Sequence, residues 1–249
     1  CFATADGRYE LRDMTTVDRT LIGTFDDQPS SYFPGYVVTW RTSGDFGYDL
    51  NDLVTGEVTP LYASSVMGDT IALYYEDGQL KVFSTATGDL ITDTAVEPVE
   101  GPQSAMMNNE GDGYVWLELR DNDRYETTAT RVYGPEGLVS DLTHLQSKYY
   151  FLNYLTTTPE GRPLYYGTAE APSRNGSLCD VLDETGNVAL GLGDLGGCYS
   201  YYSNSLNQLP DHVFVARRGF YYGWMDTDGK WLYCQSIFSS INADDEMGY

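Results

Sequence analysis

The side chains in this chain that could do acid–base chemistry are almost all carboxylates. The two histidines are His144 and His212, and each fits an ordinary loop or strand position better than a Ser/His/Asp triad. The sequence has no HExxH, Gly-x-Ser-x-Gly or GxxxxGK[ST] phosphate-binding loop. Paired carboxylates of the glycoside-hydrolase kind suit the acidic composition better. The carboxylates within or beside predicted strands are Asp45, Asp49, Asp52, Glu76, Glu118, Glu170 and Asp180.

One acidic turn resembles part of a calcium loop. Asp226, Asp228 and Gly229 match half of an Asp-x-Asp-x-Asp-Gly pattern, with Lys230 next in the chain. Calcium needs about six to eight oxygen ligands, and this turn offers two carboxylates. A solvated turn explains the same residues. Asp226 and Asp228 are therefore the candidate metal ligands, and calcium is the one cofactor considered.

Aromatic side chains are the stronger sign of a binding function. The chain contains 22 tyrosines, several of them in adjacent pairs. Adjacent residues of a strand point to opposite faces, so we expect one ring of each pair to pack inside and some of the others to be exposed. Exposed rings beside carboxylates suit sugar rings and protein interfaces. The candidate ligand-binding residues are Tyr165, Tyr166, Tyr221, Tyr222 and Trp116.

The elements that position these side chains are predicted to be short antiparallel strands. In the stretch 71–94, Asp77-Gly78 separates two apolar runs, and Thr87-Gly88 turns the chain once more. Asp-Gly in this setting predicts a tight hairpin of type I′, in which both central residues have positive φ. The stretch therefore predicts a meander of three strands.

The same unit recurs along the chain. Second turns fall near residues 17, 56, 88, 137, 186 and 229, a mean spacing of about 42 residues, which is in the range of four-stranded propeller blades. No segment shows helical periodicity. We therefore predict an all-β chain that forms one propeller domain, 1–249, with six blades; a seventh blade is left open. A two-sheet β-sandwich is the alternative.

The chain ends predict how such a ring closes. Five of the six units have an extended segment before their first hairpin, whereas the first unit begins at Cys1. A surplus segment follows Gln235. Because an open ring would leave strand edges unpaired, we predict that Ser236 to Ile241 joins Phe2 to Ala5 in one blade and closes the ring.

The most specific local motif is GFYYGWMDTDGK, from Gly219 to Lys230. Gly223-Trp224-Met225-Asp226 followed by Asp228-Gly229-Lys230 resembles the WG (KWG) repeat family. The resemblance is strong over these residues and weak elsewhere. It implies a bacterial repeat protein of β units that acts as a binding or surface module, and it carries over no catalytic residue.

Composition sets the remaining limits. Hydrophobic residues make up 41% of the chain, which argues against disorder, and 14 basic against 37 acidic residues give a net charge of −23. Such a surface repels nucleic acid and anionic membranes. No apolar run has the length of a membrane span, and no signal peptide is apparent. We expect a monomer.

The four cysteines leave several possibilities open. Their spacing matches no zinc pattern. Isolated thiols are the simpler interpretation, and a bridge between Cys179 and Cys198 is the alternative. Cys1 is compatible with a lipidated N-terminus or with a trimmed start.

Two functions from different classes are consistent with these patterns. The first is a non-catalytic, extracytoplasmic binding module, secreted or at the cell surface, for a protein or glycan partner. The alternative is a propeller glycoside hydrolase or lyase that uses a carboxylate pair.

Overall fold

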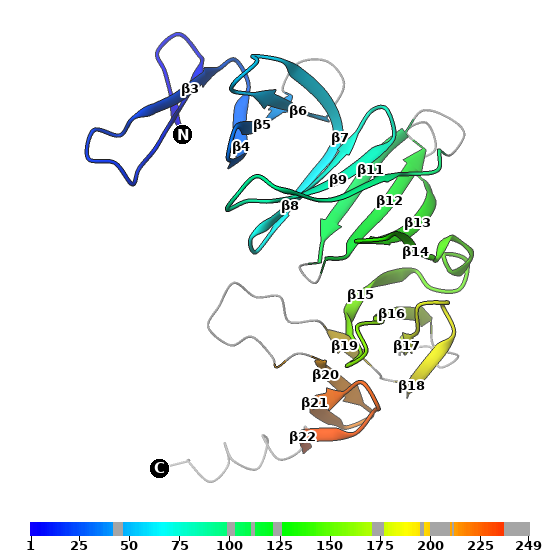
Figure 1. The fold of residues 1–249 in the computed structure, drawn as a ribbon. Coiled ribbons are helices and arrows are strands. Elements are labelled where there is room, and N and C mark those ends of the chain that lie inside the picture. The colour runs from blue at the N-terminus through cyan, green and yellow to red at the C-terminus, as the bar shows by residue number, and fades with distance from the viewer. Residues whose placement is uncertain are drawn as a thin grey trace, which may run out of the picture. The chain divides into compact units, whose positions relative to one another are not determined.

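The computed structural model describes residues 1–41, 47–98, 103–110, 113–121, 126–170, 177–194, 197–199, 210 and 212–236. In these ranges the chain forms antiparallel strands and one short 3-10 helix. None of the described helical segments is long and apolar enough to cross a bilayer. The chain divides into two compact units, Cys1–Val139 and Ser140–Tyr249. Figure 1 shows the strands of each unit in chain order.

The first unit contains three sheets, and each follows the chain in an up-and-down order. The first sheet is β1-β2-β3, the second is β4-β5-β6-β7-β8-β9-β10 and the third is β11-β12-β13-β14. Their bounds are β1 Phe2–Ala3, β2 Tyr9–Arg12, β3 Leu21–Phe25, β4 Gln28–Phe33, β5 Tyr36–Arg41, β6 Gly47–Asp52, β7 Val58–Met67, β8 Thr70–Tyr75, β9 Gln79–Ser84, β10 Leu90–Ala95, β11 Gln103–Asn109, β12 Val115–Asp121, β13 Glu126–Gly134 and β14 Gly137–Asp141.

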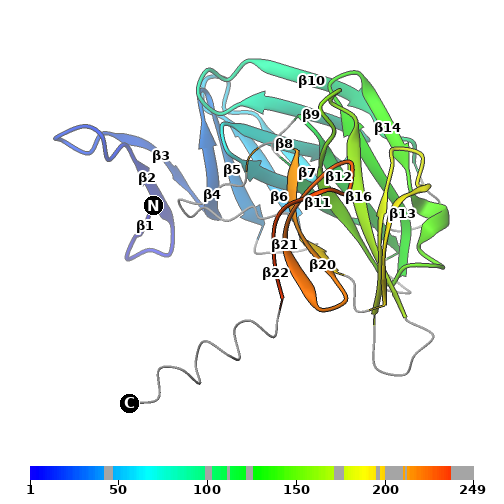
Figure 2. The ribbon, with the colours of Figure 1, turned by 90° about the horizontal axis from the view of Figure 1, so that it is seen from below.

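A single long strand, β7, joins two meanders into the seven-stranded sheet. Its first half pairs with β6, from Val58 to Leu61. Its second half pairs with β8, after an irregularity between Leu61 and Ala63. The sheet is therefore two four-stranded meanders, β4 to β7 and β7 to β10, that share one strand. Figure 2 shows β8, β9 and β10 side by side in the second of them.

The two faces of this sheet pack differently. One face of β7 to β10 packs on β11 to β14, in a cluster that includes Tyr74, Leu80, Leu117 and Tyr133. The other face encloses a second cluster around Leu61 and its buried neighbours Phe33, Val38, Leu50, Ile71 and Leu73. Alternation along each strand explains the division, because successive side chains point to opposite faces. As predicted for adjacent rings, Tyr74 belongs to the first cluster and Tyr75 packs against the second.

The second unit contains two four-stranded meanders, β15-β16-β17-β18 and β19-β20-β21-β22. Leu155, Tyr166 and Val181 of the first pack with Phe214 and Met225 of the second. The bounds are η1 Thr143–Leu145, β15 Phe151–Thr157, β16 Pro163–Glu170, β17 Ser177–Leu182, β18 Val188–Asp194, β19 Gly197–Tyr199, β20 Val213–Arg218, β21 Tyr221–Asp226 and β22 Trp231–Ser236.

The predicted turn register is confirmed by the structure. Hairpins turn at Val17-Asp18 and at residues 56, 88, 137, 186 and 229, and each of these five later positions is a glycine with positive φ. The first-hairpin glycines Gly78 and Gly219 also have positive φ, at 88° and 61°. Gly176 lies outside the described residues. Local turn chemistry was therefore enough to place most hairpins.

The predicted type of the Asp77-Gly78 turn was wrong. Among the described non-glycine residues only Arg19 and His212 have positive φ, so Asp77 does not, and a type I′ turn is excluded. The Gly78 N–H donates to the Tyr75 carbonyl at 3.0 Å. Glu76, Asp77 and Gly78 thus form a three-residue loop, in which a type I turn is followed by a left-handed glycine.

The predicted extra strand of the later units is also confirmed. The sheet β1-β2-β3 has three strands, whereas the later meanders have four. The fold is thus an all-β repeat of antiparallel meanders, of the kind that builds propeller blades. The alternative of two sheets does not fit, because the described strands form five.

Candidate functional site

Three of the five predicted ligand-binding aromatics are buried. Tyr165 is inaccessible to solvent, Trp116 is 2% exposed and Tyr166 is 9% exposed. The Tyr165 hydroxyl hydrogen-bonds with Ser140 Oγ at 2.7 Å, and the Trp116 indole N–H donates to Glu118 Oε1 at 3.2 Å. Both residues lie on inner strands, β16 and β12, whose two faces are covered. The prediction that these rings are exposed to a ligand was wrong for this reason.

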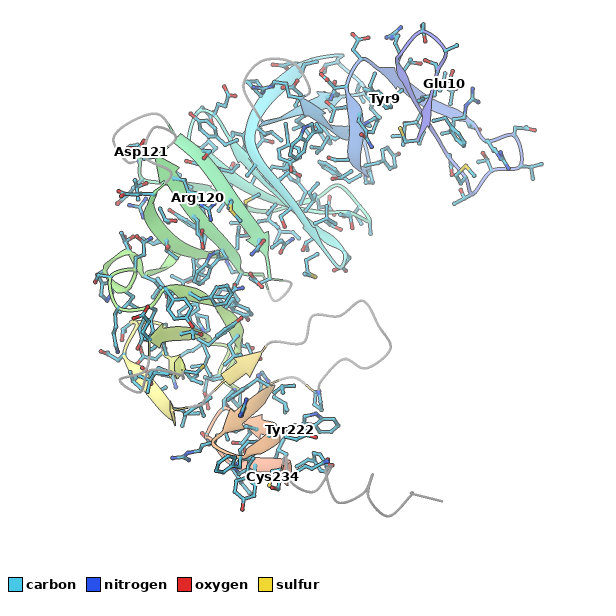
Figure 3. The ribbon with its side chains drawn as sticks, turned by 180° about the vertical axis from the view of Figure 1, so that it is seen from behind. Tyr9, Glu10, Arg120, Asp121, Tyr222 and Cys234 are labelled. Carbon is cyan, nitrogen blue, oxygen red and sulfur yellow. The ribbon has the colours of Figure 1, made fainter. Side chains whose placement is uncertain are left out.

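The other two, Tyr221 and Tyr222, are exposed on β21. The rings of Trp224 and Tyr233, on β21 and β22, contact each other, and their centroids are 6.0 Å apart. Figure 3 shows Tyr222 and Cys234 on this outer part of the last sheet. These exposed aromatic side chains give the last sheet a candidate contact surface. Its use by a ligand stays a prediction.

Asp226 and Asp228 lie in a hairpin turn, in which the Asp226 side chain accepts hydrogen bonds from backbone N–H groups. Asp226 Oδ1 accepts N–H hydrogen bonds from Asp228 at 3.1 Å and Lys230 at 2.8 Å. Asp183 plays the same part for Thr185 and Asn187 in the preceding sheet. Within the described ranges, no group of three or more His, Cys, Asp or Glu side chains could hold a metal ion. The repeat's turn geometry therefore accounts for this aspartate without calcium.

The carboxylates considered for hydrolysis are mostly bound to cations or hydroxyls. Arg41 contacts Asp49 at 2.8 Å and Glu76 at 3.3 Å, and the pKa of Arg41 is raised mainly by its hydrogen bond with Asp49. Asp180 accepts a hydrogen bond from the Tyr149 hydroxyl at 2.7 Å. Glu118 pairs with Arg120 at 3.0 Å. Asp45 lies outside the described residues.

The structure describes the surroundings of three cysteines. Cys179 is buried, whereas Cys1 and Cys234 are exposed. Cys179 packs in the apolar cluster of the second unit. Both interpretations of Cys179, as an isolated thiol and as a partner of Cys198, stay predictions.

A pocket that the sequence did not predict lies on the seven-stranded sheet. Its residues share one sheet face, because direct cross-strand partners point the same way. The register pairs Tyr36 with Asp52, and it pairs Phe83 with both Ile71 and Leu90. The pocket has a volume of about 290 Å³ and is lined by Tyr36, Leu50, Asp52, Glu57, Thr59, Tyr75, Lys81, Phe83 and Leu90.

One wall of the pocket is aromatic and rigidly supported. Tyr36 stacks on Phe33 with ring centroids 5.1 Å apart, and Phe33 also contacts Phe83 at 5.4 Å. Phe33 is fully buried in the cluster beneath the pocket. Packing of this kind fixes ring orientation, which makes a preformed surface for a ligand.

Charged groups complete the pocket. Asp52 Oδ1 accepts N–H bonds from Val54 at 2.8 Å and Thr55 at 3.0 Å, and these backbone bonds lower the pKa of Asp52. Lys81 Nζ lies 5.4 Å from the centroid of the Tyr75 ring and 3.7 Å from Asp93 Oδ2. Burial raises the pKa of Tyr75 to about 12. The pocket thus presents the carboxylates of Asp52 and Glu57, the amine of Lys81 and the phenols of Tyr36 and Tyr75.

Comparison with known proteins gives a family. The sequence matches the family described as "Domain of unknown function (DUF5046)" over residues 1–245. The chain belongs to the DUF5046 family. The match names no WG (KWG) repeat family, so the resemblance of residues 219–230 to that family stays a prediction. No curated protein matches the DUF5046 chain.

Solved structures similar to the DUF5046 chain show low similarity. The computationally designed Ika8 protein has a TM-score of 0.33 and 14% identity, over 94% of this chain and 82% of that chain. BamB from Moraxella catarrhalis has a TM-score of 0.34 and 13% identity, over 94% of this chain and 69% of that chain.

Proposed function

We propose that this DUF5046 chain is a non-catalytic binding module for a protein or glycan partner, acting outside the cytoplasm. The observation that carries the proposal is the pocket of about 290 Å³ on β5 to β10. Preformed concave sites that combine an apolar lining with a few convergent polar groups are typical of ligand binding. Tyr36 and Phe83 supply the apolar surface, and Asp52 and Lys81 supply the polar groups.

The scaffold proposed for this module is a six-bladed β-propeller in one domain. Support comes from the repeated meanders and from the three-stranded sheet β1-β2-β3, which has one strand fewer than each four-stranded meander. The segment Ser236 to Ile241 would supply the missing strand beside Phe2–Ala3. Residues 237–241 lie outside the described ranges, so this closure is a proposal for experiment.

The partners of the candidate catalytic carboxylates favour a binding function over hydrolysis. A glycosidase needs two carboxyl groups that flank the scissile bond, with one of them acting as a proton donor. Asp49 and Glu76 instead bind the same guanidinium, that of Arg41. Asp52 in the pocket caps its own turn, and backbone N–H groups lower its pKa. This carboxylate suits hydrogen-bond acceptance better than proton donation.

A ligand screen read out at the pocket tests the proposal. Peptide and oligosaccharide libraries would be screened against the whole chain by NMR, with saturable shifts expected at pocket residues. Leu90→Arg should abolish these shifts by filling the pocket mouth. Ile91→Arg is the matched control, because Leu90 is 49% exposed and its neighbour Ile91 is 46% exposed, but only Leu90 lines the pocket. Equal loss in both variants, or turnover of a glycoside, would contradict the proposal.

A further inference from the structure

We infer that the pocket on β5 to β10 takes the ring of a neutral sugar, stacked against Tyr36 and Phe83 with hydroxyls directed to Asp52 and Lys81. The inference rests on the proposed function, because it names the ligand class of the same pocket. It depends on the size of the pocket, its aromatic wall and the signs of its charges.

The volume of the pocket and its aromatic wall limit the ligand to a small ring. The volume of about 290 Å³ is at the lower end of small-molecule sites, which is too little for a peptide helix. The Tyr36 and Phe83 centroids are 6.3 Å apart with an interplanar angle of 39°, so the two rings form a shallow angled surface. The C–H face of a sugar ring matches such a surface by burying apolar area while its hydroxyls stay in polar surroundings.

The carboxylates of the pocket exclude an anionic ligand. Asp52 and Glu57 both line it. The backbone N–H groups of Val54 and Thr55 occupy Oδ1 of Asp52, which keeps this side chain ionised and acceptor-only at neutral pH. A ligand carboxylate or phosphate would therefore meet like charge, on a chain whose net charge is −23. A ligand hydroxyl can donate to the same carboxylate at no such cost.

The lysine of the pocket disfavours a cationic ligand. Lys81 already places its ammonium over the Tyr75 ring, at 5.4 Å from the centroid, which is the position a ligand cation would seek. A second cation there would lie beside Lys81 and be repelled. The ammonium can donate to a ligand hydroxyl, and Thr59 can donate or accept. Donors and acceptors together on an aromatic wall match a neutral polyol ring.

A matched series of sugars tests the charge argument directly. The probes are glucose, its cationic analogue glucosamine and its anionic analogue glucuronate, with galactose, mannose, cellobiose and maltose as further neutral members. Each would be titrated into the whole chain at pH 7 and followed by NMR shifts of the pocket residues. We expect saturable binding of at least one neutral sugar, with at least 10-fold weaker binding of the charged analogues.

Variants tie the binding to the pocket. Lys81→Met and Leu90→Arg should each weaken neutral-sugar binding at least 10-fold, while Ile91→Arg leaves it unchanged. Far-UV circular dichroism of every variant checks that the fold is retained. Tighter binding of glucosamine or glucuronate at the pocket would overturn the neutral-sugar inference and leave the binding module standing. If no sugar gives a saturable shift at the pocket, the inference is also overturned. Binding of peptides from the library at the pocket would then still support the proposed function, and their failure to bind would contradict it.

Discussion

The buried Tyr149 hydroxyl offers a sharp test of the packing in the second unit. Tyr149 is 2% exposed, and its hydroxyl donates to Asp180 Oδ2 at 2.7 Å. Lys148 Nζ lies 3.7 Å from the same carboxylate oxygen. Tyr149→Phe keeps the ring and removes only the hydroxyl, so no large cavity forms. The change leaves a buried carboxylate with one donor fewer.

The expected cost follows from the charge on the acceptor. A hydrogen bond to a charged group is worth about 1.5–3 kcal/mol, so we expect Tyr149→Phe to lower the free energy of unfolding by about 2 kcal/mol at pH 7. Urea unfolding, followed by far-UV circular dichroism, measures this difference. Tyr150→Phe is the matched control, since Tyr150 is 66% exposed and should lose little.

The pH dependence supplies an independent check. Burial and then the hydrogen bond to Asp180 raise the pKa of Tyr149 above its ordinary value of 10.0. A group whose pKa is higher in the folded chain stabilises the fold below its unfolded pKa and loses this effect as pH rises through the folded value. The wild type should therefore lose stability above about pH 10, and its advantage over Tyr149→Phe should shrink there. Equal stability at pH 7, or a constant gap at high pH, would refute the reasoning.

Three further predictions concern turns and closure. Asp226→Ala should lower the free energy of unfolding by about 1 kcal/mol, measured by thermal unfolding, because two turn N–H groups lose their acceptor. Asp228→Ala, the control, should lower it little. A saturable rise in Tm with millimolar calcium would contradict this account. Gly78→Val should lower the free energy of unfolding in urea by roughly 1 kcal/mol or more, because the φ of Gly78 is 88°, a conformation that valine rarely adopts. An unchanged stability would be inconsistent with that turn. Deleting every residue after Gln235 should lower the Tm of the whole domain in one cooperative step if the ring closes as proposed, and fraying of one end alone, seen by hydrogen exchange, would argue against closure.

The sequence by itself determined the local architecture. Turn positions at Gly56, Gly88, Gly186 and Gly229 were predicted correctly because a left-handed residue between two strands requires glycine. Strand alternation placed Tyr74 and Tyr75 on opposite faces before any contact was known. The hairpin turns near the start of the chain likewise predicted the antiparallel order of the sheet β1-β2-β3. These features depend on neighbours within a few residues, which a single sequence contains.

Only the tertiary structure decided which faces are covered. Tyr165 and Tyr221 are both tyrosines in adjacent-ring pairs, yet the first is fully buried and the second is exposed. The pocket depends on the same kind of long-range information, because residues from Tyr36 to Leu90 meet on one face only after six strands pair in register. Burial is set by which sheet packs on which, and no local pattern encodes that partner. For this reason the repeat could be read from the sequence, whereas the binding surface could not.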